Sequence, residues 1–255
     1  MKVAIITGAT SGLGWEAAVQ IDERFKSLDE IWIIGRREDK LLELSACLAH
    51  STRSFTMDVT DAQDRKEFCE ALKKYRPNIR MLFQSAGKGL HGDFDKMKIE
   101  DETEMLRLNC EALLEMTHLC LPYMRKNSHI IHIASMAAFL PFPGYSVYGA
   151  SKAFVLNFSR ALRAELRKRK IHVMAVCPGP VNTPFFDVSE RYTNGLSAFK
   201  KKFMNTPEKV IKKALNDAGS HRAVSVDNCI MRFCYFLSRV LSHDFIAGLL
   251  RFLRT

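Results

Sequence analysis

The segment TGATSGLG at residues 7–14 decides the fold of this chain. It follows the apolar run KVAIIT at residues 2–7 and opens a stretch in which apolar residues recur every fourth position, from 13 to 25. This pattern predicts a strand, a glycine-rich turn and a helix in that order. Glycines at positions 8, 12 and 14 let the backbone turn sharply and approach a pyrophosphate, whose charge the helix N-terminus favours. The sequence therefore predicts a dinucleotide site here.

The rest of the chain repeats this alternation of strand and helix. Short apolar runs that are typical of parallel strands buried on both faces occur at residues 2–7, 30–35, 53–57, 80–86, 129–135 and 171–178. A last short strand is expected at 222–226, and Thr206-Pro207-Glu208 predicts the start of a late helix. We therefore predict a doubly wound parallel sheet with helices on both faces, in one large α/β domain or two small ones.

Charge and cysteine content narrow the function classes. The chain carries a net charge of +10, but its basic stretch RAELRKRK (163–170) fits the solvated end of an amphipathic helix. Because the basic stretches lack interleaved aromatic residues, we expect no nucleic-acid partner. The seven cysteines form neither a CxxC motif nor a Cys/His cluster, so reduced thiols and no metal site are expected. The first apolar run does not resemble a secretory signal, so we expect a cytoplasmic location.

The end of the second predicted strand indicates which dinucleotide is bound. NAD-selective folds usually place an acid there for the ribose 2′-hydroxyl, whereas this chain has Gly35-Arg36-Arg37. A guanidinium can pair with a 2′-phosphate. We therefore expect NADP(H) to be preferred over NAD(H), with Arg36 and Arg37 at the phosphate. The acids Glu38 and Asp39 fit the first turn of the next helix.

The segment YGASK (148–152) supplies a candidate proton relay. On a helix, Tyr148 and Lys152 lie on one face about one turn apart. An adjacent ammonium and a bound nicotinamide cation both favour phenolate, so we expect the pKa of Tyr148 to fall below its ordinary value of about 10. Ser135, at the end of a predicted strand, would hold the substrate oxygen while Tyr148 exchanges its proton and hydride moves between carbon and nicotinamide. Alone, the YxxxK pattern also occurs by chance in helices.

The order of these motifs resembles the short-chain dehydrogenase/reductase family over nearly the whole chain. The matching positions are TGxxxGxG, Asp58-Val59, Gln84-Ser85-Ala86-Gly87, Asn109, Ser135, Tyr148, Lys152 and PGPVNT (178–183). The resemblance implies a single Rossmann-type domain over residues 1–255 that uses NAD(P)(H). It also implies the catalytic residues Asn109, Ser135, Tyr148 and Lys152. With the patterns above, it assigns the cofactor to Gly8, Ser11, Gly12, Leu13, Gly14, Arg36, Arg37, Asp58, Val59, Ala86, Gly87, Tyr148, Lys152, Pro178, Gly179, Val181 and Thr183.

The same resemblance implies finer roles and a homodimer or homotetramer. Lys152 would also bind the nicotinamide ribose, Asn109 would hold a water, and the Asp58-Val59 pair would border the adenine. One departure stands out, because the family usually has Asn-Asn-Ala-Gly where this chain has Gln84-Ser85-Ala86-Gly87. The side-chain bonds that brace the sheet there must be made differently.

Apolar residues near the predicted site indicate a lipophilic substrate. We expect a substrate loop at residues 184–205, and the candidate lining residues are Met136, Phe139, Leu140, Phe142, Phe185 and Phe186. Several of these side chains could equally fill core.

The C-terminal segment at residues 228–254 has an apolar helical stripe interrupted by Arg232, Arg239, Asp244 and Arg251. These charges argue against a bilayer span. We expect an amphipathic helical segment that packs on the domain or a subunit, lies over the substrate site, or contacts a membrane surface peripherally.

Three functions follow as hypotheses. The leading one is an NADP(H)-dependent oxidoreductase acting on a lipophilic ketone or secondary alcohol, such as a hydroxysteroid or bile-acid-like compound. A second is a 3-oxoacyl-thioester reductase of fatty-acid synthesis, for which basic patches could accept an acidic carrier. A third is a non-catalytic NADPH sensor, which the intact set of Asn109, Ser135, Tyr148 and Lys152 disfavours.

Overall fold

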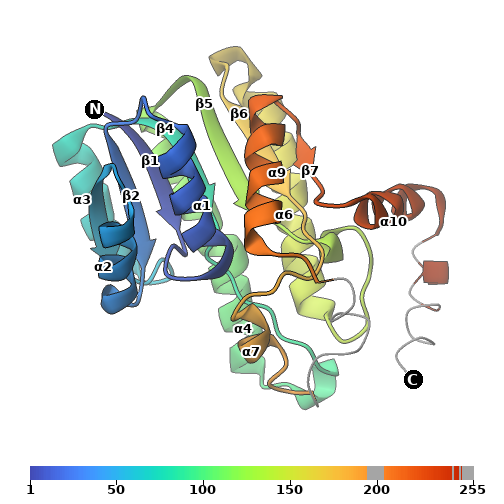
Figure 1. The fold of residues 1–255 in the computed structure, drawn as a ribbon. Coiled ribbons are helices and arrows are strands. Elements are labelled where there is room, and N and C mark those ends of the chain that lie inside the picture. The colour runs from blue at the N-terminus through green and yellow to red at the C-terminus, as the bar shows by residue number, and fades with distance from the viewer. Residues whose placement is uncertain (194–203, 243, 247, 249–255) are drawn as a thin grey trace.

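A seven-stranded parallel sheet forms the centre of the molecule (Figure 1). The computed structural model describes residues 1–193, 204–242, 244–246 and 248. The strands are β1 (Lys2–Thr7), β2 (Glu30–Gly35), β3 (Ser51–Thr56), β4 (Asn78–Gln84), β5 (Met124–Ile133), β6 (His172–Val176) and β7 (Val224–Ser225). Each predicted strand is confirmed, although β5 begins at Met124 rather than at residue 129 and β7 has only two residues.

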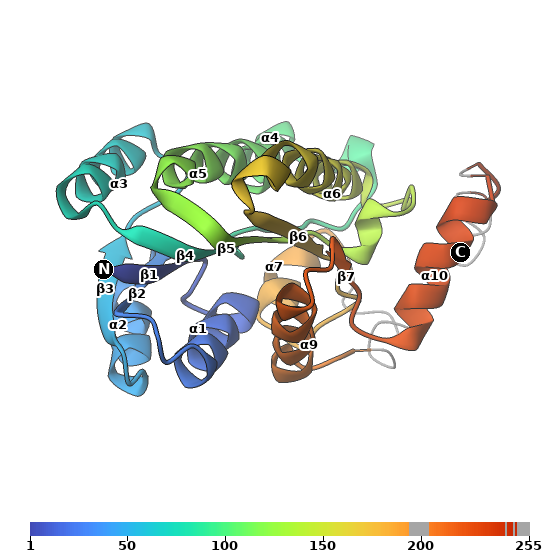
Figure 2. The same cartoon turned by 90° about the horizontal axis from the view of Figure 1, so that it is seen from above.

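Helices cover both faces of this sheet, as the alternating pattern predicted. They are α1 (Gly12–Arg24), α2 (Glu38–Cys47), α3 (Ala62–Tyr75), α4 (Ile99–Leu106), α5 (Ala112–Cys120), α6 (Ser146–Glu165), α7 (Phe185–Ser189), α9 (Pro207–Gly219) and α10 (Cys229–Val240). Figure 2 shows α1, α2 and α9 on one face and α3, α5 and α6 on the other. Because apolar strand residues point to both faces, each layer of helices closes its own core.

The strand order is β3-β2-β1-β4-β5-β6-β7. The order reverses between β1 and β4, so the loops that leave these two strands run to opposite faces of the sheet. Such a switch point leaves a crevice at the carboxyl ends of the strands, where ligands of open α/β sheets bind. The fold therefore brings the glycine-rich turn after β1 and the Ala86-Gly87 turn after β4 to the same crevice.

A buried polar network braces β4 where the family's usual asparagine pair is missing. Gln84 Nε2 donates to the Leu113 carbonyl oxygen at 3.2 Å and to Thr117 Oγ1 at 2.6 Å. Thr117 Oγ1 lies 3.2 Å from His132 Nε2, and His132 Nδ1 lies 2.8 Å from Ser159 Oγ. Burial lowers the pKa of His132 to about 3, so the imidazole is neutral. The network joins β4 and β5 to α5 and α6, which fixes the floor of the crevice.

Two segments expected near the substrate are described only in part. Of the predicted loop at residues 184–205, the structure describes α7 and its flanks, while 194–203 lie outside the described residues. In the C-terminal segment α10 is described, and the positions at 243, 247 and 249–255 are not. Within the described parts of the chain, no helix is long and apolar enough to cross a membrane. The predicted late helix is confirmed, because α9 begins at Pro207 directly after Thr206.

Candidate active site

The glycine-rich turn is packed so tightly that no side chain would fit at Gly8 or Gly14. Gly8 and Gly12 have φ values of 69° and 56°, in the left-handed region that favours glycine. A Cβ on Gly14 would lie 2.1 Å from the Gly8 carbonyl oxygen, and one on Gly8 would lie 2.6 Å from the Ala86 nitrogen. The turn thus packs directly against the start of the loop after β4. This bare backbone beside the N-terminus of α1 fits the pyrophosphate of a dinucleotide.

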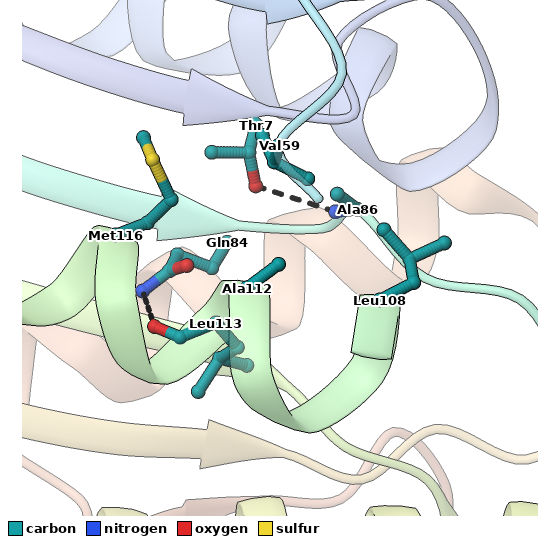
Figure 3. Close-up of a pocket in the computed structure, with 8 residues that line it drawn as sticks. All are labelled: Thr7, Val59, Gln84, Ala86, Leu108, Ala112, Leu113 and Met116. Carbon is teal, nitrogen blue, oxygen red and sulfur yellow. Dashed lines mark hydrogen bonds between the residues drawn. The ribbon is translucent and has the colours of Figure 1, made fainter. Parts of the chain in front are cut away.

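A narrow hollow lies beside this turn (Figure 3). Two predicted cofactor residues, Val59 and Ala86, line it together with Leu108 and Thr7. Thr7 Oγ1 accepts a hydrogen bond from the Ala86 nitrogen at 3.3 Å, which ties the ends of β1 and β4 together. Leu108 was not among the predicted site residues. It follows α4 in sequence, and only the packing of the helices brings it to the crevice.

The two arginines after β2 lie at the rim of the crevice in different environments. Arg36 is 68% exposed and reaches Asp58 at 3.4 Å. Arg37 instead donates to the Thr10 carbonyl oxygen at 2.8 Å and to Thr10 Oγ1 at 3.2 Å. Burial would raise the pKa of Asp58, but hydrogen bonds from Thr60 and the Arg36 charge leave it lowered. Asp58 is therefore ionised at neutral pH and holds the guanidinium of Arg36 near the mouth of the crevice.

Asn109 lies in a wide turn of π-helix, η2 (Arg107–Glu111), between α4 and α5. The fourfold spacing of Leu106, Cys110, Leu114 and His118 in the sequence predicts an unbroken helix there, and the extra residue in the π turn interrupts it. Asn109 Oδ1 accepts from the Lys88 nitrogen at 3.0 Å, while Nδ2 donates to the Lys88 carbonyl oxygen at 2.8 Å and to Ser151 Oγ at 3.0 Å. The turn thus anchors the loop after β4 to helix α6.

The structure brings Ser135, Tyr148 and Lys152 together at the carboxyl edge of the sheet. Tyr148 lies in the first turn of α6, and Lys152 Nζ lies 5.8 Å from its ring centroid. Ser135 follows β5 and makes a side-chain hydrogen bond with Tyr148. Lys152 is buried, and its Nζ donates to the Ile133 carbonyl oxygen at 2.9 Å. A Cβ on Gly87 would lie 3.0 Å from Asn109 Oδ1 and 3.3 Å from Lys152 Nζ, so Asn109 borders the same site.

The predicted direction of the Tyr148 pKa shift is wrong for the protein chain itself. Burial raises the pKa of Tyr148 to about 12, although the hydrogen bond with Ser135 opposes the rise. Burial also lowers the pKa of Lys152 to about 8. Lys152 Nζ donates to the Ile133 carbonyl rather than to the phenol, so its charge does not offset the desolvation of Tyr148. At neutral pH the phenol is therefore protonated.

The remaining predicted cofactor residues form the far wall of the crevice, after β6. The Pro178 carbonyl accepts from the Met136 nitrogen at 2.9 Å, and the Gly179 nitrogen donates to Asp227 at 3.3 Å. Val181 is buried and forms an isolated β-bridge with Asn205. Thr183 reaches across to the glycine-rich turn, since a Cβ on Gly12 would lie 3.1 Å from its methyl group. Ser11 caps the start of α1 with its backbone, and Leu13 packs against the core.

The predicted apolar lining divides between the site and the core. Phe185 lies against Tyr148, with ring centroids 5.9 Å apart. The ring centroid of Phe186 lies 5.5 Å from that of Phe185. Phe139 is buried in a core cluster and contacts Tyr235 of α10 at 4.4 Å. Met136 and Leu140 pack against the same cluster as Phe139. Phe185, with Phe186 behind it, forms an apolar wall next to Tyr148.

A polar cluster near Tyr148 was not predicted. Glu190 accepts from Tyr145 Oη at 3.2 Å and from Thr193 Oγ1 at 2.6 Å, and it lies 3.0 Å from His91 Nδ1. The His91 and Tyr145 rings are stacked at 4.4 Å, and Tyr145 lies 5.6 Å from Tyr148. These residues come from three separate loops, so no local pattern links them. Their contacts join these three segments next to Tyr148.

The fold and this site define a nicotinamide-dependent oxidoreductase, and comparison with known proteins agrees. A family model described as short chain dehydrogenase matches residues 2–192. The chain belongs to the short-chain dehydrogenase/reductase family. It is an oxidoreductase that acts on CH–OH groups and uses a nicotinamide cofactor.

Several relatives carry names that bear on the substrate. The NADP-dependent 3-hydroxy acid dehydrogenase YdfG of Shigella flexneri is 34% identical over 209 residues, which cover 80% of this chain and 82% of the relative. Serine 3-dehydrogenase of Rhizobium radiobacter is 33% identical over 186 residues, which cover 71% and 72%. The closed form of serine dehydrogenase complexed with NADP⁺ matches with a TM-score of 0.74 and 30% identity, covering 86% of this chain and 89% of the other.

Proposed function

We propose that this protein is an NADP(H)-dependent oxidoreductase that transfers a hydride between the nicotinamide and the carbon of a ketone or secondary alcohol. The convergence of Ser135, Tyr148, Lys152 and Asn109 beside the dinucleotide turn carries this proposal. When bound, the nicotinamide supplies or accepts the hydride.

The protein's own residues handle the oxygen and its proton. Ser135 and Tyr148 hydrogen-bond the substrate oxygen, and the protonated phenol of Tyr148 donates its proton when a carbonyl is reduced. The buried ammonium of Lys152, whose pKa is about 8, stabilises the phenolate that remains. Asn109 holds the loop after β4 against α6, and this contact fixes the position of Lys152 relative to the loop.

We also propose that NADP(H) is preferred over NAD(H). The exposed guanidinium of Arg36 supports this preference, since it is held at the mouth of the crevice and can pair with a 2′-phosphate. The similarity to the NADP-dependent dehydrogenase YdfG and to a serine dehydrogenase that was solved in complex with NADP⁺ also supports this preference.

Two substrate classes have support. The apolar wall of Phe185 and Phe186 favours a lipophilic ketone or secondary alcohol, of which hydroxysteroids and bile acids are examples. The polar cluster around Glu190 and the names of the relatives favour a small hydroxy acid instead. A 3-oxoacyl thioester combines an apolar chain with a polar carrier and remains the third possibility.

A substrate panel tests these proposals. We expect purified protein to oxidise NADPH with one class of substrate among keto-steroids, keto bile acids, 3-oxo acids and 3-oxoacyl thioesters. The Tyr148→Phe variant serves as the blank for each substrate. Turnover of a 3-oxo acid alone would exclude the lipophilic substrate. Tight NADPH binding without turnover of any compound would contradict the catalytic proposal and support a sensor.

An exposed apolar face on the α4–α6 side supports a homodimer or homotetramer. Leu106, Leu114 and Phe154 are 39%, 43% and 39% exposed along this side of the molecule. Burying such side chains against a second copy would remove them from water. A monomeric mass by light scattering would contradict this proposal.

A second exposed stripe supports peripheral membrane contact through α10. Phe233, Phe236 and Val240 are 59%, 60% and 65% exposed on this helix, next to the exposed cation Arg232. An apolar stripe flanked by a cation is typical of a helix that lies on an anionic membrane surface. On its other face α10 packs on the domain through Met231 and Tyr235.

We expect the purified protein to float with phosphatidylglycerol vesicles at low salt. Replacing both Phe233 and Phe236 with serine should reduce the bound fraction about tenfold, because two large apolar side chains no longer insert. Leu42→Ser is the matched control, since Leu42 is 61% exposed on α2 at the other end of the molecule. Protein that stays entirely unbound at low salt would contradict the membrane proposal.

A further inference from the structure

A cationic cleft lies at the edge of the sheet opposite to the active site. It has a volume of about 280 Å³ and is lined by Lys73, Arg76, Pro77, Pro122, Tyr123 and Arg125. These residues come from the end of α3, the start of β4, the turn η3 (Leu121–Tyr123) and the start of β5. Figure 1 shows the N-terminal ends of β4 and β5 at the edge away from α4 and α7.

The cleft is distinct from the cofactor crevice. Its residues precede or begin β4 and β5, whereas Gln84 and Ser135 mark the other ends of these strands. Seven residues of extended strand separate the two edges by about 20 Å. A ligand in the cleft would therefore leave the dinucleotide turn and Tyr148 free.

Two of the three cations in the cleft have no partner among the residues that the structure describes. Lys73 pairs with Glu70 at 2.7 Å. The guanidinium groups of Arg76 and Arg125, both exposed, form no hydrogen bond or ion pair with any residue that the structure describes. Arg169 lies next to them, because its Nη2 donates to the Leu121 and Met124 carbonyls at 2.9 and 3.2 Å. The positive charge at this edge thus exceeds what its acids neutralise.

The geometry of the cleft is held by backbone as well as side chains. Arg76 ends α3 in the left-handed conformation, with φ of 42°, and its nitrogen donates to the Leu72 carbonyl at 2.9 Å. Pro77 and Pro122 stiffen the two walls, and the Tyr123 ring adds a flat surface. Cations in the last turn of α3 also complement the helix dipole. That effect accounts for Lys73 and Arg76 but not for Arg125 and Arg169, which come from other segments.

We propose that this cleft binds a small anion that carries two or more phosphate groups. Unpaired guanidinium groups match phosphate oxygens because each can donate two parallel hydrogen bonds. The volume is sufficient for a diphosphate with a small organic group, which the Tyr123 ring can contact. Monoanions would leave part of the charge uncompensated, so the second phosphate adds to the affinity.

Isothermal titration of inorganic pyrophosphate tests this proposal on protein saturated with NADP⁺, which blocks the dinucleotide site. We expect one pyrophosphate to bind per chain in 50 mM salt, more weakly in 150 mM salt, and inorganic phosphate to bind less tightly. The double variant Arg76→Asn with Arg125→Gln should raise the Kd about tenfold or more. Asparagine tolerates the left-handed conformation at position 76, so the end of α3 is preserved.

The matched control is Lys66→Gln, which removes one exposed cation from α3 outside the cleft. This control should leave the Kd unchanged. If the double variant does not fold, the pair Lys73→Gln with Arg125→Gln tests the same cleft. Absence of binding in 50 mM salt, or equal affinity in wild type and double variant, would overturn the proposal. Because the readout is binding, the result does not depend on whether any substrate is turned over.

Discussion

Tyr148→Phe is expected to lower kcat for carbonyl reduction by about 10³-fold, because it removes the hydroxyl that donates the proton. The remaining groups of the site do not replace it. Lys152 Nζ is bound to the Ile133 carbonyl, and Ser135 Oγ accepts a hydrogen bond from the Ala137 nitrogen. NADPH binding should change less than about twofold, since the dinucleotide turn and the arginines are untouched. Steady-state rates and NADPH fluorescence titration measure the two quantities.

Tyr145→Phe is the matched control for this prediction. Tyr145 directly precedes α6, and its ring lies 5.6 Å from that of Tyr148. Its hydroxyl binds Glu190 instead of Ser135, so its loss should cost less than about tenfold in kcat. An active Tyr148→Phe enzyme would contradict the proposed mechanism, and equal losses in both variants would indicate a packing effect.

Arg36→Asp is expected to reduce kcat/KM for NADPH about 100-fold while changing the value for NADH little. A charge-assisted hydrogen bond to phosphate contributes about 1.5–3 kcal/mol, and the new carboxylate repels the 2′-phosphate as well. The new carboxylate at position 36 also lies next to Asp58, which forms an ion pair with Arg36 in the native protein. The ratio of the two kcat/KM values, measured with one substrate, reports the change in preference.

Lys26→Asp makes a similar charge reversal at an exposed position beyond the C-terminal end of α1 and should leave the ratio unchanged. Arg37→Gln should have a smaller effect than Arg36→Asp, because Arg37 is already engaged by Thr10. If Arg36→Asp retained the full NADPH preference, the 2′-phosphate contact would lie elsewhere, with Arg37 the next residue to test.

Much of the fold could be predicted because its signals are local. The strand at 2–7, the turn at 7–14 and the helix after it lie within a few dozen residues, and each is encoded by its own spacing. The start of α9 at Thr206-Pro207 is also encoded by a local signal, the proline in the first turn. The helix predicted around Asn109 is interrupted by a π turn, within which Asn109 binds Lys88 and Ser151, residues far away in sequence that no local pattern connects to it.

The replacement of the family's asparagine pair shows a second limit of prediction from sequence. The sequence predicted that the brace after β4 must differ, and Gln84 does make it through Leu113 and Thr117. Which partners it would choose depended on where α5 packs. Phe139 illustrates the same point for apolar residues, since only the position of Tyr235 on α10 places it in the core rather than in the substrate site.

The sequence by itself determined the parallel sheet, the dinucleotide turn and the spacing from Ser135 to Tyr148 and Lys152, because hydrophobic periodicity and glycine placement act on neighbouring residues. Only the tertiary structure decided the protonation of Tyr148 and the cationic cleft around Arg76 and Arg125. Both depend on burial and charge contributed by segments that are distant along the chain. Desolvation and electrostatics are set by that three-dimensional surrounding, which no local pattern encodes.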